Sequence, residues 1–222
     1  NDFYSTGNYL AVWNSTNITD LAALKTASGK DAHSVSYNPI FASPTNLHAL
    51  SPWVNAKGTP LAEVTDDIDG QPRNGSTPDI GSDEFTPNPS VTTPLAGSYT
   101  IGAAGSYTTF GAAVSDLLIR GISAPVTFNV LTGSYNEHFV LTDVPGTGPG
   151  NTVTFQAQTG NPANATLFYL AAALDSNYTV RINGGKYLRF HKITLRSNNA
   201  SGAPYSRIMD LMGGWDYLTI DS

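Results

Sequence analysis

The stretch that most constrains the fold is residues 106–130, where a helical pattern runs directly into a strand pattern. Thr109 is suited to cap a helix and Gly121 to end it. Pro125 then opens a predicted strand in which alternate residues point to the same side. The helix would bury one apolar stripe, made of Phe110, Ala113, Val114, Leu117 and Leu118. A single short helix followed only by short strands predicts a lid over the open end of a stack of strands.

Short apolar runs continue after this helix, separated by turn-forming residues. Two all-β architectures use such a pattern: an antiparallel β-sandwich, and a parallel β-solenoid with coils of roughly 20 to 30 residues. The lid helix favours the solenoid, because the open end of a strand stack must be shielded from edge-to-edge association. The predicted strands are residues 126–130, 139–141, 153–155, 167–170, 180–182, 188–195, 208–211 and 218–220.

A proline-rich segment at residues 86–94 divides the chain, and its composition is that of a stiff linker. We therefore predict a first unit at residues 1–85 and a second at residues 95–222. In the first unit, Thr19 and Asp20 precede a helix of one or two turns that ends at Gly29. Residues 217–220 are strand-like and no closing element follows them, so we expect both ends to be cuts through a longer protein.

The composition excludes several classes of protein. Only 13% of the residues are charged, well below the roughly 25% of typical soluble domains, and Asn, Ser, Thr and Gly supply the polarity instead. A net charge of -6 without a basic stripe argues against binding nucleic acid. The absence of cysteine excludes disulfides and cysteine-ligated metals. No apolar run approaches the ~18 residues of a membrane span.

Several motifs follow one another in the first unit: SVSYNPIF at residues 34–41, LH at 47–48, SP at 51–52, AKG at 56–58, DIDGQPR at 67–73 and PDIGSDEF at 78–85. Their order resembles the C-terminal end of the secreted right-handed parallel β-helix proteins of Bacteroidota-type bacteria, which are pectate-lyase-like in fold and often carry "choice-of-anchor" domains. The chain departs from the usual pattern at Asn38, at Trp53-Val54 and at Ser82, changes that do not threaten the fold.

The second unit resembles the beginning of another such β-helix. The similarity lies in GSYTIG at residues 97–102, YTTF at 107–110, AV at 113–114, GI at 121–122, PVTFNV at 125–130 and GSYNE at 133–137. The resemblance implies an all-β chain in which the tail of one right-handed β-helix is joined to the capped head of the next. It also implies a large cell-surface or released protein carried by the type IX secretion system, and it is nearly silent on activity.

The densest acidic group in the sequence lies between Asp66 and Glu84. Alternating carboxylates followed by glycine, as in Asp67-Ile68-Asp69-Gly70, are typical of calcium loops, although the full EF-hand pattern is absent. The alternative is structural: a turn at Asp69-Gly70, and Arg73 paired with a nearby carboxylate. The candidate calcium ligands are Asp67, Asp69, Asp79 and Glu84.

Enzymatic and sugar-binding residues are less well defined. Glycoside hydrolysis needs two carboxylates close together, but the acidic residues of the second unit, Glu137, Asp143, Asp175 and Asp210, are isolated in the sequence. A lyase base could come from Arg181, Lys186, Arg189, Lys192 or Arg196, for which a solvated coil face is the alternative account. Trp13, Trp53 and Trp215 could stack on sugars, but aromatic residues more often fill cores. The histidines lack zinc spacing, and His33 and His48 fit hydrogen-bonded packing positions.

From these observations we expect a structural or adhesive repeat segment of a large extracellular protein, with neighbouring copies or adjacent domains of the same protein as partners. The alternatives are a β-helical polysaccharide lyase or hydrolase and a carbohydrate-binding module, for which a surface polysaccharide would be the partner. We expect no nucleic acid, no membrane span and no organic cofactor, and calcium as the candidate ion.

Overall fold

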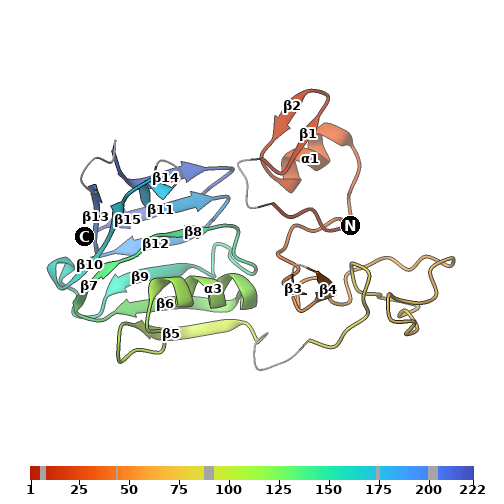
Figure 1. Ribbon diagram of the computed structural model, residues 1–222, viewed down its shortest axis with the longest axis horizontal. Helices are drawn as coiled ribbons and strands as arrows, with labels where there is room; N and C mark the ends of the chain where they lie inside the picture. The colour runs from red at the N-terminus through yellow and green to blue at the C-terminus, as the bar shows by residue number, and fades with distance from the viewer. Residues whose placement is uncertain (6–8, 44, 88–92, 174–175, 200–204) are drawn as a thin grey trace. The chain divides into compact units, whose positions relative to one another are not determined.

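The computed structural model of the chain (Figure 1) describes residues 1–5, 9–43, 45–87, 93–173, 176–199 and 205–222. The chain divides into two compact units, Asn1–Thr93 and Pro94–Ser222. Most of the predicted linker, residues 88–92, lies outside the described residues. No helix in the described ranges is both long enough and apolar enough to cross a membrane.

The first unit begins with a hairpin and a helix. Strands β1 (Ala11–Trp13) and β2 (Thr16–Ile18) pair antiparallel. The two residues between them, Asn14 and Ser15, have φ of 46° and 63°, the positive values that a type I′ hairpin turn requires. Helix α1 (Leu21–Ser28) starts after Asp20, whose side chain accepts from the Ala23 N–H, and ends at Gly29 in the left-handed conformation. The helix predicted before Gly29 is therefore confirmed.

Strands β3 (Phe41–Ser43) and β4 (Asn46–Ala49) form a second antiparallel pair. The predicted parallel coils of residues 1–85 are thus not found among the described strands of this unit, where parallel pairing is limited to a single bridge between Asp2 and Val35. The reason for the first hairpin is local, since a two-residue turn can join strands only antiparallel. That this unit ends a longer β-helix stays a prediction.

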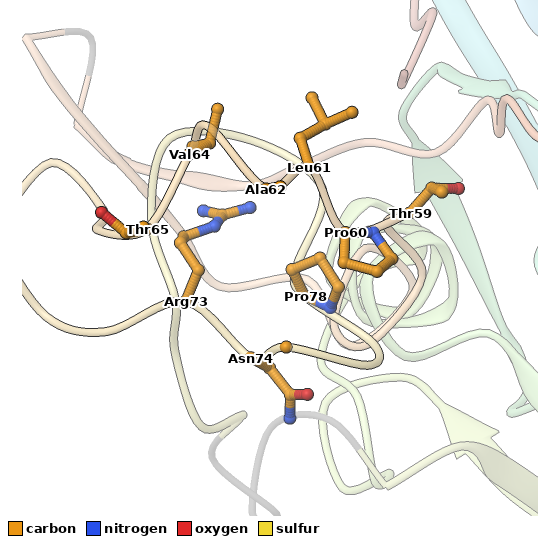
Figure 2. Close-up of a pocket in the computed structure, with 10 residues that line it drawn as sticks. Thr59, Pro60, Leu61, Ala62, Val64, Thr65, Arg73, Asn74 and Pro78 are labelled. Atoms are coloured by element: carbon orange, nitrogen blue, oxygen red, sulfur yellow. The ribbon is translucent and has the colours of Figure 1, made fainter.

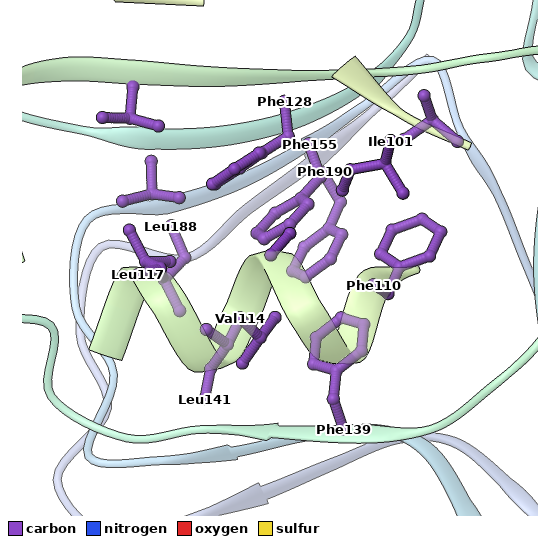
Figure 3. Packing of buried hydrophobic residues seen from close by; sticks show 14 of the residues in the cluster. Ile101, Phe110, Val114, Leu117, Phe128, Phe139, Leu141, Phe155, Leu188 and Phe190 are labelled. Atoms are coloured by element: carbon purple, nitrogen blue, oxygen red, sulfur yellow. The ribbon is translucent and has the colours of Figure 1, made fainter. Parts of the chain in front are cut away.

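Helix α3 (Phe110–Arg120) of the second unit is confirmed with both of its predicted ends. The Thr109 side chain accepts from the Ala112 N–H at 3.0 Å, and Gly121 follows with φ of 62°. Phe110, Ala113, Val114 and Leu117 are buried, and the helix packs against the phenylalanine side chains of the strands (Figure 3). The helix therefore lies over the core as the predicted lid.

The strands of the second unit form three parallel sheets, ordered β5-β6-β9-β12-β15, β7-β10-β13 and β8-β11-β14. From β6 onward, each strand pairs with the third strand further along the chain, so each sheet receives one strand per turn of the chain. All pairs between the described strands of this unit are parallel, so the antiparallel sandwich is wrong for it. The strands are β5 (Leu95–Ile101), β6 (Ile122–Val130), β7 (Gly133–Asn136), β8 (Phe139–Leu141), β9 (Val153–Ala157), β10 (Ala165–Ala171), β11 (Tyr178–Asn183), β12 (Leu188–His191), β13 (Thr194–Asn199), β14 (Arg207–Met212) and β15 (Thr219–Asp221), with a 3-10 turn at Pro162–Asn164.

Three details of the strand prediction are corrected. The run at residues 188–195 is two strands, because Lys192 adopts a φ of 47° and turns the chain between β12 and β13. Strand β7 has too few apolar residues to be recognised in the sequence. Pro125 does not open β6 but lies inside it, where the pairing with β5 slips between Leu95 and Gly97, and a proline is tolerated at such an irregularity.

The core of the second unit is built of stacked side chains in register. Phe128, Phe155 and Phe190 occupy matching positions on β6, β9 and β12 and are all completely buried. Their neighbouring ring centroids are 4.9 and 5.4 Å apart. Phe110 of the lid helix stacks on Phe139 of β8 at 5.7 Å and on Phe155 at 6.1 Å, so the helix packs against this column of rings (Figure 3).

Candidate functional site

The acidic loop, residues 65–85 of the first unit, is held by carboxylates that accept hydrogen bonds from backbone N–H groups. Asp67 Oδ1 accepts from Asp69 at 2.9 Å and from Gln71 at 2.8 Å, while its Oδ2 accepts from Glu84 at 3.1 Å. Burial alone would raise the pKa of Asp67, but these hydrogen bonds lower it below its ordinary value. The ionised Asp67 side chain therefore joins the two arms of the loop.

Asp79 and Arg73 complete the framework of the acidic loop. The Asp79 carboxylate accepts from the backbone N–H groups of Ala56 at 2.6 Å and Phe85 at 2.8 Å, and its burial raises its pKa. The Arg73 guanidinium lies 3.4 Å from Glu84 and donates to the Asp79 carbonyl at 2.5 Å. Through these contacts the side chains of Asp79 and Arg73 stabilise the loop itself.

The four candidate calcium ligands therefore differ in their surroundings. Three of them, Asp67, Asp79 and Glu84, are engaged by backbone N–H groups or by Arg73. The structural alternative agrees with this geometry, since Gly70 has a φ of 75° at the turn and Arg73 pairs with Glu84. Calcium binding at these residues stays a prediction.

The fourth candidate, Asp69, lies beside two residues that the calcium prediction did not include. His48 on β4 places its Nε2 2.7 Å from Asp69 Oδ2. The Ile68 N–H donates to the Ser82 carbonyl at 2.8 Å, which brings the following residues, Asp69 and Asp83, to the same place. One ligand atom each of His48, Asp69 and Asp83 lies within 4.8 Å of the others. A hydrogen bond donated by the His48 ring to the Asp69 carboxylate raises the pKa of His48.

A pocket of about 480 Å³ adjoins the acidic loop (Figure 2). Its wall is largely apolar and includes Pro60, Leu61, Val64 and Pro78. Arg73 also lines it, but its guanidinium donates to backbone carbonyls of the loop and faces Glu84. Among the residues lining this pocket, we find no second charged group with which Arg73 could act on a ligand.

The outer face of the sheet β5-β6-β9-β12-β15 carries a row of polar side chains. Asn129, Gln156, His191 and Asp221 occupy matching positions on β6, β9, β12 and β15. Gln156 donates to Asn129 at 2.9 Å, and Asp221 lies 2.5 Å from His191 Nδ1 and 2.5 Å from an N–H group of Arg189. Hydrogen bonds from Arg189 and His191 lower the pKa of Asp221.

The candidate lyase residues do not converge. Arg181 is on β11, where it pairs with Asp210 at 2.8 Å, whereas Arg189 is on β12 and Arg196 on β13. These three strands belong to three different sheets. Lys186 and Lys192 lie in the turns that flank β12. The geometry agrees with the alternative account of a solvated coil face.

The candidate carboxylates of the second unit have separate roles. Glu137 accepts from the first N–H groups of α3, at Phe110 and Gly111, at 3.2 and 3.0 Å. Asp210 pairs with Arg181 and Arg207, and Asp143 lies beyond β8. Asp175 lies outside the described residues. The described carboxylates of this group therefore do not form the pair that hydrolysis needs.

The prediction that tryptophans fill the core is wrong for two of the three. Trp13 and Trp215 are 38% and 44% exposed, because one precedes a tight hairpin turn and the other lies in the last coil. Trp53 is partly buried, and its ring lies 5.7 Å from that of Tyr37. Among the aromatic contacts of the described residues, neither Trp13 nor Trp215 lies against another ring.

The last coil of the second unit exposes side chains whose counterparts are buried. Ile220 on β15 is in register with Phe190, yet it is 59% exposed while Phe190 is fully buried. Leu211 on β14 is in register with Ile182 and is 42% exposed, against complete burial of Ile182. The inward-facing apolar columns therefore continue to an uncovered end.

Comparison with known proteins leaves the chain without an assigned family. No protein-family model matches its sequence, and no curated protein matches it either. A similar solved structure is that of the pectin methylesterase from Aspergillus niger in deglycosylated form, with a TM-score of 0.40 and 18% identity. The match covers 58% of this chain and 47% of that one, so the chain spans about half the length of that enzyme.

Proposed function

We propose that this chain is a structural segment of an extended extracellular protein, and that its second unit is a right-handed parallel β-helix whose open end stacks with a further β-coil. The observation that carries the proposal is the exposed last member of each apolar column: Ile220 after Phe190, and Leu211 after Ile182. In a solenoid each coil buries the inward face of the coil before it. The chain composition and the sequence resemblance to secreted β-helix proteins support the extracellular setting.

The two ends of the strand stack differ in whether another element covers them. At the β5 end, helix α3 covers the core with four buried side chains. At the other end, β13, β14 and β15 each have one strand neighbour, so their outer edges present unpaired backbone groups. Exposed strand edges beside exposed apolar residues form a template for pairing with another strand. The strand edges of β13, β14 and β15 are therefore the surface on which a further β-coil would stack.

The experiment compares the wild-type chain with two variants of β15 by sedimentation velocity over a range of concentrations. Ile220 faces the core column, whereas its neighbour Thr219 lies on the opposite face of the same strand. We expect the wild-type chain to associate end to end, Ile220→Lys to abolish association, and the matched control Thr219→Lys to retain it. Electron micrographs of the associated form should show elongated particles.

Two results would overturn the proposal. One is a monomeric wild-type chain at every concentration, with no binding of a dye that reports exposed apolar surface. The other is association that Ile220→Lys leaves intact, because the contact would then lie elsewhere on the molecule.

A second candidate function is polysaccharide binding on the outer face of the sheet β5-β6-β9-β12-β15. The row formed by Asn129, Gln156 and His191, with Arg189 beside it, offers hydrogen-bond donors and acceptors at the spacing of successive strands, about 4.8 Å. The test is affinity electrophoresis in gels containing neutral or acidic polysaccharide. Retardation lost in Gln156→Ala but kept in Thr166→Ala, a variant of the neighbouring sheet, would support it, and equal mobility in every gel would exclude it.

A further inference from the structure

Beyond the structural role, we propose that His48, Asp69 and Asp83 bind a divalent transition-metal cation in the first unit. These residues come from β4 and from the two arms of the acidic loop. One nitrogen and two carboxylate oxygens lie within 4.8 Å of one another. Zinc ligands at ~2.0 to 2.2 Å from the ion lie at most about 4.4 Å apart, so the proposed site closes around the ion by a side-chain shift of a few tenths of an ångström.

Asp83 provides the observation that distinguishes this group from an ordinary acidic surface. It is only 5% exposed, and within the described ranges of the chain no N–H or O–H group donates to its carboxylate. Its contact with Arg73 is made by the backbone carbonyl. A buried carboxylate costs free energy unless a cation or hydrogen-bond donors compensate its charge. The partners that lie near the Asp83 carboxylate are His48 and Asp69.

The hydrogen bonds of His48 favour a ligand role for its Nε2. Its Nδ1 lies against the Asn46 side-chain oxygen, and an N–H donated there leaves the Nε2 lone pair facing Asp69. A lone pair 2.7 Å from a carboxylate oxygen is repulsive unless a positive charge lies between the two atoms. Either a second proton on the imidazole or a cation can supply that charge. Histidines that bind metals commonly donate their other ring N–H to a carbonyl or carboxylate in this way.

The framework of the acidic loop fixes both carboxylate ligands. Asp67 accepts from the Asp69 N–H and, through its other oxygen, from the Glu84 N–H, so one side chain holds the backbone beside Asp69 and beside Asp83. Arg73 donates to the Asp83 carbonyl at 3.3 Å. Of the residues predicted as calcium ligands, Asp69 thus belongs to the proposed site, and Asp67 orients it.

The donor set selects the class of ion. Calcium takes six to eight oxygen ligands and has no preference for imidazole. Imidazole suits zinc, copper, iron and nickel, and a mixed set of one nitrogen and two carboxylates leaves at least one position for water. We therefore expect Zn²⁺ to bind more tightly than Ca²⁺.

Isothermal titration of the full chain, freed of metal by a chelator, tests this site with ZnCl₂ and CaCl₂ as the probes. We expect one Zn²⁺ per chain, weakened at least about tenfold in Asp83→Asn and in His48→Ala. The matched control is Asp66→Asn, which removes the same charge from the same loop at an exposed position outside the group. It should keep wild-type affinity. Far-UV circular dichroism checks that each variant folds, and His48→Ala changes a partly exposed side chain.

A second readout follows the His48 ring directly. Nitrogen-15 spectra should show Zn²⁺ shifting its Nε2 resonance, with Nδ1 remaining protonated. The proposal is overturned if Zn²⁺ fails to bind, if it binds Asp83→Asn and His48→Ala as tightly as the wild type, or if Ca²⁺ binds equally well without His48. In the first case the compensating charge is a second proton on the imidazole.

Discussion

Replacing Phe155 with alanine should be among the most damaging single changes in the second unit. The ring is completely buried on β9, between Phe128 and Phe190 in the same column. It also stacks on Phe139 at 6.0 Å and on Phe110 of the lid helix at 6.1 Å. Phe155 is therefore the residue at which two sheets and the helix meet.

The magnitude follows from burial and from ring contacts. A fully buried phenylalanine costs about 3 to 5 kcal/mol when truncated to alanine, and each aromatic pair adds about 0.5 to 1.5 kcal/mol beyond its buried area. Because Phe155 has four ring neighbours, we expect Phe155→Ala to lower the free energy of unfolding by about 5 kcal/mol or more, the upper end of that range. Ile220 continues the same column but is 59% exposed, so Ile220→Ala should cost less than half of the ~2 to 5 kcal/mol of a buried isoleucine.

The assay is urea unfolding of the full chain, with hydrogen exchange measured on peptides from β6 and β12 to report the second unit alone. We expect Phe155→Ala to lower the unfolding free energy at least twice as much as Ile220→Ala under conditions where the chain is monomeric. Equal losses would refute the reasoning, because the column would then contribute no more at its centre than at its open end.

Three further changes test other contacts of the second unit. Gly146→Ala should lower the free energy of unfolding by more than about 2 kcal/mol, because Gly146 has φ of +89° and an added Cβ would clash with a backbone carbonyl of β6. Gly148→Ala is the control, since an added Cβ there meets no neighbouring atom, and thermal unfolding compares the two variants. Glu137→Gln should cost about 0.5 to 2 kcal/mol in urea unfolding, because it weakens the cap of α3, and an unchanged midpoint would contradict this. Burial and the nearby Arg181 charge lower the pKa of His138 below its ordinary 6.5. The stability that the neutral His138 contributes is therefore present above that pH and lost as the pH falls. His138→Phe should flatten the pH dependence of the unfolding free energy between pH 7.5 and 5, and a pH dependence that persists unchanged in the variant would refute this prediction.

Local patterns in the sequence were sufficient to predict most of the second unit. The alternation of Val126, Phe128 and Val130 is reproduced by the burial of β6. The stripe of α3 is buried as predicted except at Leu118, which is only partly buried. Both follow from short-range periodicity, which depends on which face of an element meets the core. The split at Lys192 could not be foreseen, because a left-handed conformation at a lysine is imposed by the turn between two sheets and leaves no compositional sign.

The candidate sites were harder to predict, since their contacts join distant residues. His48 meets Asp69 across 21 positions, and Glu137 reaches the N-terminus of α3 from 27 positions away. The sequence shows that Asp67 and Asp69 are separated by one residue. It does not show that both oxygens of Asp67 accept hydrogen bonds from backbone N–H groups. A dense run of carboxylates therefore drew attention to this loop without showing which side chains hold the loop together.

The two proposals use the same physical criterion, a group whose burial does not match its partners. Ile220 is an apolar side chain in a column of buried residues, yet water covers more than half of it. Asp83 is an acidic residue only 5% exposed, with no donor to its carboxylate among the described residues. Exposed apolar area favours association by about 25 cal/mol per Å², and a buried charge favours a cation. Ile220→Lys removes the exposed apolar side chain, and Asp83→Asn removes the buried charge. The two variants therefore test the two proposals separately, and either proposal can fail while the other holds.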